Sequence, residues 1–218
     1  MAMKNRPTVL VSMRLAPATN YREERDAISH DWLTFLARFD LTLIFAPNNS
    51  AVTSILLREL NPSHVLLTGG DNVAATSAQS GSVRDEVERQ ILDYAVGNNA
   101  RVFGTCRGLQ FTNVYFGGAV TKDLKAAIPG EMHVGERHRI VLPDTDQTET
   151  VNSFHDQGVM RHQVAAALHP FAFSEQGVVE AVRHRDRPIL AVQWHPERDG
   201  SAEKLDRELL RAWLQDDR

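Results

Sequence analysis

The sequence predicts an α/β protein: a mostly parallel sheet flanked by helices, with an antiparallel extension towards the C-terminus. Two observations carry this prediction. Apolar, β-branched runs alternate with amphipathic helical patterns between residues 8 and 118, which is typical of right-handed βαβ units. After residue 118 the apolar runs become shorter and turns separate them, which indicates added antiparallel strands. We expect one domain over residues 1–218.

The first half of the chain carries the expected parallel strands and their connecting helices. Uninterrupted apolar stretches indicate strands buried on both faces, and they occur at residues 8–15, 41–46, 65–68 and 102–103. Apolar residues that recur every three or four positions indicate helices at 23–39, 52–60, 83–97 and 109–116. The second half predicts shorter strands and a closing helix, at 138–142, 148–154, 164–173, 178–183, 189–194 and, for the helix, 202–214.

Composition places the chain among ordinary globular proteins. Its 218 residues are 42% hydrophobic and 24% charged, with a formal net charge of −4. This charge gives no sign of binding to nucleic acid or to an anionic membrane, and no apolar run approaches the roughly 20 residues that span a bilayer. A single cysteine cannot form an internal disulfide, and the polar first seven residues do not resemble a signal peptide. We expect a cytoplasmic protein.

That cysteine, Cys106, lies where an expected strand meets an expected helix. The stretch Gly104-Thr-Cys-Arg-Gly108 has the G-x-nucleophile-x-G spacing of a nucleophile elbow, with cysteine where hydrolases usually carry serine. Glycines suit so sharp a turn because they have no Cβ, and the N-terminus of the following helix favours a thiolate. A buried structural cysteine is the alternative, but the strand–turn–helix context favours a nucleophile.

A thiol nucleophile needs a base, and the base needs an orienting partner. His195 follows an apolar strand pattern and precedes Pro196, which favours an extended backbone at the histidine. His195 and Glu197 would then project to the same side, so that Glu197 orients the imidazole towards the thiol. A surface-loop histidine is the alternative, but the elbow favours a Cys106-His195-Glu197 triad.

Acyl transfer also needs hydrogen-bond donors for the oxyanion. The N–H of Arg107, directly after the nucleophile, is one candidate by elbow geometry. The pair Gly69-Gly70, after the third expected strand, is the other, because glycines let the backbone approach a substrate closely. A plain tight turn is the more common role of such a pair.

Two further patterns concern metal ions and nucleic acid. The pairs His133 with His138 and His155 with His162 match no zinc spacing, and no pair of cysteines accompanies them. The basic run at 183–187 is short, contains an acid and precedes a proline, which favours a hairpin turn. We therefore expect neither a metal site nor a nucleic-acid surface.

Several motifs resemble the class I glutamine amidotransferase superfamily: G-T-C-R-G-L-Q at 104–110, V-N-S-F-H at 151–155 and V-Q-W-H-P-E at 192–197. Within it, T-G-G-D-N at 68–72 and R-D-E-V-E at 84–88 look like the gamma-glutamyl hydrolase branch. The resemblance implies a flavodoxin-like fold, a cysteine–histidine–glutamate triad and a gamma-glutamyl thioester that water hydrolyses. It implies no metal and no organic cofactor.

The resemblance also implies which residues surround the substrate. Gly70 and Arg107 would supply the oxyanion amides. The pocket for the glutamyl group would be lined by Gln110, Asn152, Ser153, Phe154 and His155. Arg84 and Glu180 would read its α-carboxylate and α-amine, because either charge is costly to bury unpaired. A solvated helix face for Arg84 and an exposed strand position for Glu180 are the alternatives.

A narrower likeness concerns the leaving group. The stretch at 12–32, with H-P-E-R at 195–198, is similar to short capsule-biosynthesis members that act on gamma-glutamyl-CDP-amidate. A diphosphate favours cationic partners, which Arg14, Arg22, Arg25, Arg107 or the segment 133–139 could supply. Each arginine taken singly is more often solvated or paired within the fold. Departures from the gamma-glutamyl-GABA hydrolases, such as Asp156-Gln157 where a second histidine is usual, leave the leaving group open.

The sequence therefore predicts a stand-alone hydrolase that releases glutamate from a small gamma-glutamyl amide. If the substrate is gamma-glutamyl-CDP-amidate, the second product is cytidine diphosphoramidate. The alternative is a glutaminase subunit that supplies ammonia to a separate synthase. The expected partners are the small-molecule substrate and either such a synthase or a second copy of the chain.

Overall fold

The computed structural model describes residues 6–74, 76–79, 81–129 and 133–214, so residues 1–5, on which the signal-peptide expectation partly rests, lie outside the described part. The first half of the chain contains β1 (Thr8–Ser12), β2 (Arg14–Leu15), β3 (Asp26–Ala27), α1 (His30–Leu36), β4 (Thr42–Ala46), α2 (Ser50–Leu60), β5 (His64–Leu67), α3 (Val83–Asn98), β6 (Arg101–Thr105), α4 (Arg107–Tyr115) and α5 (Leu124–Ala127). The second half contains β7 (Val134–Leu142), β8 (Gln147–Phe154), β9 (Val159–Met160), a 3₁₀ turn (Arg161–Gln163), β10 (Leu168–Ser174), β11 (Val178–His184), β12 (Ile189–Val192) and α6 (Glu203–Leu214).

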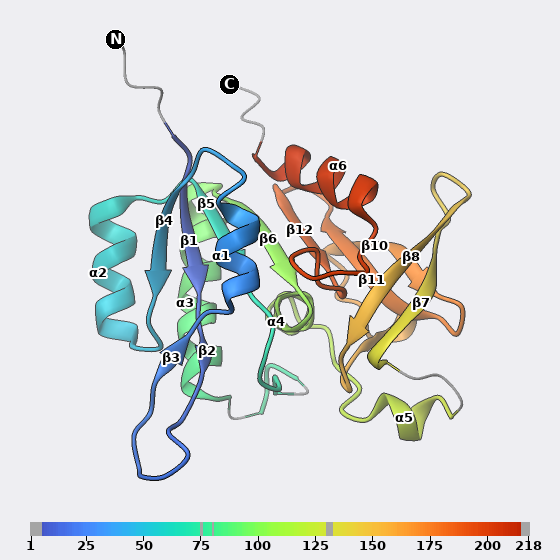
Figure 1. Cartoon of the computed structure of the whole chain (residues 1–218), viewed down its shortest axis with the longest axis horizontal. Coiled ribbons are helices and arrows are strands. Elements are labelled where there is room, and N and C mark those ends of the chain that lie inside the picture. Colours follow the sequence, from blue (N-terminus) through green and yellow to red (C-terminus); the bar gives the residue numbers. More distant parts are fainter. Residues whose placement is uncertain (1–5, 75, 80, 130–132, 215–218) are drawn as a thin grey trace.

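Except for the β2–β3 hairpin, the described strands form one mixed sheet (Figure 1). Its order is β4-β1-β5-β6-β12-β11-β10-β7-β8, and β9 pairs with β11. The five strands from β4 to β12 run parallel, whereas the neighbours from β12 to β8 are antiparallel. This confirms the predicted α/β class with its antiparallel C-terminal extension. The single domain over residues 1–218 stays a prediction.

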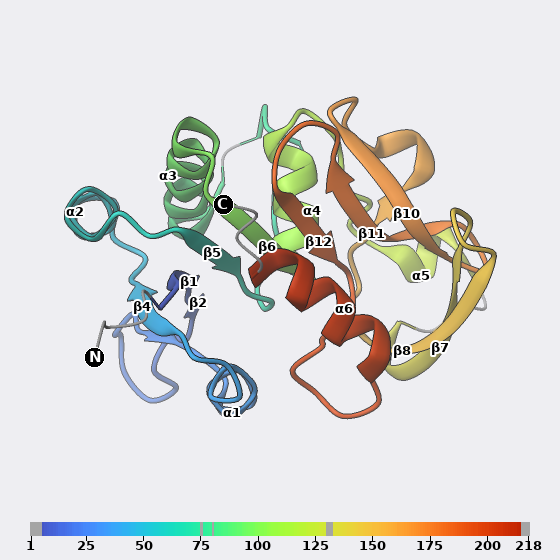
Figure 2. The ribbon, with the colours of Figure 1, turned by 90° about the horizontal axis from the view of Figure 1, so that it is seen from above.

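Helices cover both faces of the sheet (Figure 2). On one face α2, α3 and α4 pack against the strands, and Leu57, Ile91 and Leu109 belong to one buried apolar cluster. On the other face lie α1 and α6, whose Trp32 and Trp213 belong to a second cluster. Burial of apolar surface is the dominant favourable term in folding, so these two layers fix the strand ends on which the candidate site is built.

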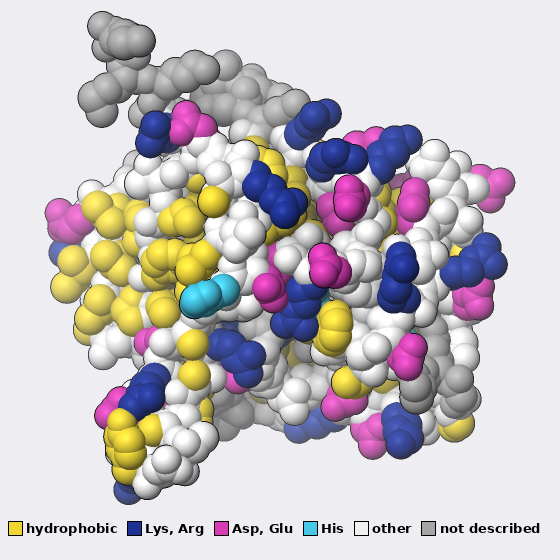
Figure 3. Space-filling view, viewed as in Figure 1, with side chains coloured by type: hydrophobic (Ala, Val, Ile, Leu, Met, Phe, Trp, Pro, Cys, Tyr) yellow, Lys and Arg dark blue, Asp and Glu magenta, His cyan; other side chains and the backbone are white. Residues whose placement is uncertain are grey.

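The edge of the sheet at β4 presents apolar side chains to solvent. Figure 3 shows them gathered over α1, β4 and α2, while charged side chains of both signs are mixed over the other side of this face. Exposed members include Leu33, Phe45, Val52 and Ile55. Within the described residues, no helix combines the length and the apolar character needed to cross a bilayer.

The N-terminal region differs from the prediction of one helix over residues 23–39. Helix α1 is much shorter, and Ser29 caps it by accepting a hydrogen bond from the Asp31 N–H (3.2 Å). The residues before the cap form the β2–β3 hairpin. The Asp26 carboxylate holds it in place by accepting hydrogen bonds from the backbone N–H (2.9 Å) and the side-chain amide (2.6 Å) of Asn48. Contacts with a distant loop thus outweigh a weak local helix propensity.

Two strand predictions are also corrected. The stretch 8–15 divides into β1 and β2, because β2 leaves the main sheet to pair with β3. The stretch 164–173 becomes a strand only from Leu168, after the 3₁₀ turn. The two residues of β9 and the four of α5 were not predicted, because such short elements carry little periodic signal.

Strand β6 and helix α4 approach each other closely, and the elbow glycines make this possible. A Cβ added to Gly108 would collide with the carbonyl oxygen of Leu67 on β5. A Cβ added to Gly104 would lie 2.9 Å from the carbonyl carbon of Gly108. Packing at this density leaves no room for a methyl group, so both glycines are required for α4 to begin directly on the edge of the sheet.

Replacing Gly108 by alanine should destabilise the protein by about 2–3 kcal/mol, because the backbone at Leu67 would have to move. Gly97→Ala is the matched control, since Gly97 lies in α3 and a Cβ there meets no atom within 4 Å. Alanine at that position should stabilise the helix by about 0.5–1 kcal/mol. Urea unfolding followed by circular dichroism measures both changes. Equal stability of Gly108→Ala and the wild type would show that this crossing admits a side chain.

Candidate active site

Cys106 occupies the turn between β6 and α4 in a strained backbone conformation. Its φ of 51° and ψ of −104° lie in a region that residues with a side chain rarely adopt. The Cys106 N–H donates to the carbonyl oxygen of Val192 on β12 (2.8 Å), and the Cys106 carbonyl accepts from the N–H of Leu109 (3.0 Å). The turn is therefore tied to both the neighbouring strand and the first turn of α4, which fixes the position of the thiol.

His195 follows β12 and lies between Cys106 and Glu197. Its Nδ1 atom is 2.6 Å from Glu197 Oε1, and both side chains are buried. A Cβ built on Gly69 would be 3.5 Å from His195 Nε2 and 3.5 Å from Cys106 Cβ, so the opposite edge of the imidazole lies next to the cysteine. The imidazole of His195 therefore lies between Cys106 and the buried carboxylate of Glu197.

The surroundings of His195 favour its protonated form. Burial alone would lower the pKa of the imidazole. The charge and hydrogen bonding of Cys106, together with those of Glu197, outweigh burial and raise the pKa to about 9. At neutral pH this site can hold a proton on the imidazole, which a general acid must do.

Asn152, on β8, fixes the backbone of His195. Its Oδ1 accepts a hydrogen bond from the His195 N–H (2.9 Å), and its Nδ2 donates to the His195 carbonyl (2.9 Å). The next residue, Ser153, donates its hydroxyl to the carbonyl of His133 (2.6 Å). Both residues were expected to line the glutamyl pocket, but the described lining includes neither. The structure places them behind the site, as supports for its wall.

A pocket of about 260 Å³ contains Cys106 and His195 in its wall. Most of the residues predicted to contact substrate also line it, namely Arg14, Gly70, Arg107, Gln110, Phe154 and His155. Two cations face it: Arg14 on β2, and Arg198, whose guanidinium lies 4.7 Å from the centre of the Phe154 ring. The described lining does not include Arg22, Arg25 or the arginines of 133–139. The pocket is therefore small and polar, and its described lining carries the carboxylates of Asp71 and Asp156 as well as arginines.

Gly70 and Arg107 contribute backbone to this wall from two different turns. Gly70 has a φ of 94° in the turn after β5, a conformation that glycine adopts without strain. Arg107 is the first residue of α4, and the first N–H groups of a helix have no acceptor within it. Both backbones are therefore placed where an oxyanion could accept hydrogen bonds.

The Arg107 side chain enters a buried ionic network behind the pocket. It pairs with both Asp85 and Glu88 of α3. Glu88 also accepts a hydrogen bond from Arg84 Nε (2.9 Å). Burial raises the pKa of Glu88, but Arg107 and Arg84 outweigh it and hold that pKa below its usual value. The network therefore ties the beginning of α4 to α3.

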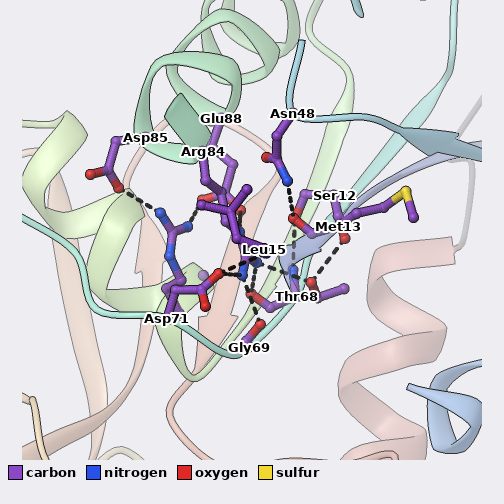
Figure 4. A network of polar contacts seen from close by, with 12 residues as sticks. Ser12, Met13, Leu15, Asn48, Thr68, Gly69, Asp71, Arg84, Asp85 and Glu88 are labelled. Carbon is purple, nitrogen blue, oxygen red and sulfur yellow. Dashed lines mark hydrogen bonds and ion pairs between the residues drawn. The ribbon is translucent and has the colours of Figure 1, made fainter. Parts of the chain in front are cut away.

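Arg84 holds the turn that carries Gly69 and Gly70 (Figure 4). Its guanidinium donates to the carbonyls of Thr68 (2.8 Å) and Gly69 (3.1 Å) and to the Asp71 carboxylate (3.0 Å). The side chain is completely buried, which contradicts the solvated helix face considered as an alternative. It is also absent from the described pocket lining. Arg84 thus positions the turn, and its expected contact with the α-carboxylate of the substrate stays a prediction.

Glu180, on β11, is also buried and lies outside the described pocket lining. Its complete burial contradicts the exposed strand position. Glu180 Oε1 is 3.3 Å from His138 Nε2 and 3.9 Å from His155 Nε2. Ligand atoms of His133, His155 and Glu180 lie within 4.8 Å of one another, so these described residues could hold a metal ion. This set differs from the histidine pairs considered from spacing.

Comparison with known proteins identifies the family to which this site belongs. Residues 25–197 match the family described as Peptidase C26. The chain belongs to the Peptidase C26 family. This confirms the resemblance to the class I glutamine amidotransferases and their gamma-glutamyl hydrolase branch.

Relatives of the Peptidase C26 chain include two named hydrolases. The chain is 24% identical over 212 residues to the gamma-glutamyl-CDP-amidate hydrolase of Campylobacter jejuni, covering 94% of this chain and 96% of the relative. It is 30% identical over 167 residues to the gamma-glutamyl-gamma-aminobutyrate hydrolase PuuD of Escherichia coli, covering 66% of this chain and 64% of the relative. The solved structure of a proposed GMP synthase component from Thermoplasma acidophilum superposes with a TM-score of 0.68 at 18% identity, covering 97% of this chain and 94% of the other. That likeness shows a shared fold.

Sequence reasoning missed five residues of the described pocket lining in this Peptidase C26 protein, namely Asp71, Asn72, Asp156, Gln157 and Arg198. Arg198 directly follows the H-P-E motif, and a cation next to a catalytic motif is a signal that could have identified it. Gln157 had no such signal. Its carbonyl accepts from Gln110 Nε2 (2.8 Å), and its side-chain oxygen accepts from the Val73 N–H (3.1 Å). Only the folded chain brings these distant segments together.

The imidazole of His195 should titrate near pH 9 in the wild type and at lower pH in Glu197→Gln, which removes one of the charges that raise its pKa. Because this pKa is raised on folding, its stabilisation is fully present below about pH 6.5 and is lost as the pH rises through about 9. Nuclear magnetic resonance titration of ring-labelled histidine measures the pKa in both proteins. The variant His162→Gln is the control: it removes the signal of an exposed histidine and should leave the titration of His195 unchanged. An unchanged titration in Glu197→Gln would contradict the role given to the carboxylate.

Proposed function

We propose that the protein hydrolyses a gamma-glutamyl amide through a gamma-glutamyl thioester on Cys106. The observation that carries this proposal is the placement of one buried imidazole between the cysteine and a buried carboxylate. The His195 Nδ1 to Glu197 Oε1 distance is 2.6 Å, and Cys106 occupies a strained elbow. The kinship with a gamma-glutamyl-CDP-amidate hydrolase supports the substrate class.

The proposed reaction divides acyl transfer into two steps. The Cys106 sulfur attacks the side-chain carbonyl of the glutamyl group, and the charge on the oxygen is stabilised by the N–H groups of Gly70 and Arg107. His195 gives a proton to the departing nitrogen, and the carbon–nitrogen bond breaks. His195 then takes a proton from water, which attacks the thioester and releases glutamate. Glu197 orients the imidazole throughout.

Two cations of the pocket wall support an anionic leaving group. Arg14 and Arg198 both line the pocket that contains Cys106. A guanidinium group can donate two parallel hydrogen bonds to two oxygens of one phosphate. Together with the near full-length relative in Campylobacter jejuni, this favours gamma-glutamyl-CDP-amidate as the substrate and cytidine diphosphoramidate as the product. We propose that the reaction takes place in the cytoplasm.

The second candidate function is a glutaminase subunit that delivers ammonia to a synthase. The apolar edge at α1, β4 and α2 supports it, since exposed side chains such as Phe45 and Ile55 offer a surface for a partner protein. This function requires free glutamine as the substrate and activity that depends on the partner. The two candidates therefore differ in what the isolated protein can hydrolyse.

Glutamate release from gamma-glutamyl-CDP-amidate, a gamma-glutamyl-GABA conjugate and glutamine should distinguish these functions. The isolated wild type should turn over a conjugate, and Cys106→Ala should lose at least about 10⁴-fold in kcat. Glu197→Gln should lose about 10²–10⁴-fold. Full activity of Cys106→Ala would overturn the mechanism. Turnover of glutamine alone, appearing only when a synthase is added, would support the second candidate instead.

Arg14→Ala should raise KM for the diphosphate conjugate about tenfold, which corresponds to roughly 1.4 kcal/mol, and should affect glutamyl-GABA much less. Arg22→Ala is the matched control, because Arg22 is an exposed residue of the same hairpin and lies outside the described pocket lining. Steady-state kinetics on both conjugates measure the difference. If Arg14→Ala raised KM equally for both conjugates, Arg14 would contact the glutamyl group that they share. The proposed contact between Arg14 and the diphosphate would then be wrong.

A further inference from the structure

A second cluster of chemically competent side chains lies behind His155, away from the thiol. It consists of His133 just before β7, His155 just after β8 and Glu180 on β11. Their fractional exposures are 5%, 4% and 0%, and their ligand atoms lie within 4.8 Å of one another. His138 on β7 adjoins the cluster, with its Nε2 atom 3.3 Å from Glu180 Oε1. Segments far apart in the chain thus converge on one buried point.

The hydrogen bond of His155 determines which of its nitrogens can bind a cation. Nδ1 lies 2.9 Å from the carbonyl oxygen of Gln157, and a carbonyl only accepts, so Nδ1 carries the proton. A lone pair therefore remains on Nε2, which lies 3.9 Å from Glu180 Oε1. If Nε2 were also protonated, a charge-assisted hydrogen bond of about 2.8 Å would be expected here. The lone pair of His155 Nε2 and the carboxylate oxygen Oε1 of Glu180 thus face each other across a gap.

The width of that gap is close to the spacing of two ligands on one metal ion. Zinc binds imidazole nitrogen at about 2.0–2.1 Å and carboxylate oxygen at about 2.0–2.2 Å in a tetrahedral shell, so two of its ligand atoms lie about 3.4 Å apart. The distance between His155 Nε2 and Glu180 Oε1 is 3.9 Å, so a shift of about 0.5 Å between the two side chains would bring both atoms to a shared ion. A histidine that donates its other N–H to a backbone carbonyl is also the usual arrangement around a bound metal.

The buried charge of Glu180 also favours a bound cation. Its carboxylate is completely buried, and the described groups that pair with it are the histidines of this cluster, with His138 Nε2 at 3.3 Å and His155 Nε2 at 3.9 Å from Oε1. A buried carboxylate is costly unless a cation compensates it. Besides the neighbouring histidines, the described ion pairs give Glu180 no arginine or lysine.

We propose that His133, His155 and Glu180 bind one divalent transition-metal ion of the zinc class, with His138 in position to become the fourth ligand. Two or three imidazoles and one carboxylate form a nitrogen–oxygen set that suits zinc. The ion would join β7, β8 and β11 at the wall of the pocket, which His155 itself lines. Its role is to fix this wall, and the inference is independent of the leaving group and of the proposed hydrolysis.

Metal analysis of the full-length protein, purified without chelator or histidine tag, tests the proposal directly. Zinc, removed with a chelator and then returned as the free ion, should bind at about one equivalent per chain and raise the melting temperature. Cobalt(II) in its place should give the visible absorption of a site with nitrogen and oxygen ligands. Glu180→Gln and His133→Ala should each weaken binding at least about tenfold.

Two controls distinguish this cluster from other zinc-binding groups. Cys106→Ala should retain the metal, which excludes binding by the thiol with His195, and the exposed His162→Ala should retain it as well. Circular dichroism verifies that each variant is folded, and X-ray absorption on the wild type reports the ligand shell even if both ligand variants unfold. The proposal fails if the wild type binds no stoichiometric zinc or cobalt. It also fails if Cys106→Ala abolishes binding while Glu180→Gln preserves it.

Discussion

The turn at Cys106 is the constraint on which the rest of the site depends. A residue with a side chain adopts a φ of 51° there, at a cost of about 1–3 kcal/mol. The surrounding structure holds it by packing Gly104 and Gly108 against backbone and by the hydrogen bond from the Cys106 N–H to Val192. Because β12 supplies that acceptor and then continues to His195, the same contact that holds the cysteine also places the histidine. The proposed nucleophile and the proposed base are therefore both held by one pair of parallel strands, β6 and β12.

A buried ionic network supports the site from the opposite side. Arg84 and Arg107 share Glu88, and through them α3 holds both the turn of Gly69-Gly70 and the beginning of α4. Removing one partner of such a network leaves an uncompensated buried charge, which costs far more than an exposed pair contributes. The buried charges hold the backbones of Gly70 and Arg107, the two expected oxyanion donors, in fixed positions. This is a physical reason for placing an ionic network behind so small a pocket.

Prediction from sequence was strongest where local pattern and tertiary environment agree. The parallel strands follow continuous apolar runs, and the helix after Ser82 begins with the expected cap, whose hydroxyl accepts from the Asp85 N–H. Prediction failed at 23–39, where Asp26 bonds to Asn48 and draws the chain into a hairpin. The side chains of Asn152 and Ser153 bond to the backbones of His195 and His133, and their expected contact with substrate stays a prediction. A motif identifies which residues belong to a site but not the direction in which each side chain points.

The sequence by itself determined the fold class and predicted the elbow around Cys106, with His195 as the proposed base and Glu197 as the carboxylate proposed to orient it. These follow from short spacings and from strand and helix periodicity, which are local properties of the chain. Only the tertiary structure decided that Arg84 supports a turn, that Arg198 and Gln157 line the pocket, and that Glu180 meets His133 and His155. The physical reason is that hydrogen bonds and ion pairs between distant segments depend on strand order and register, which no local pattern encodes.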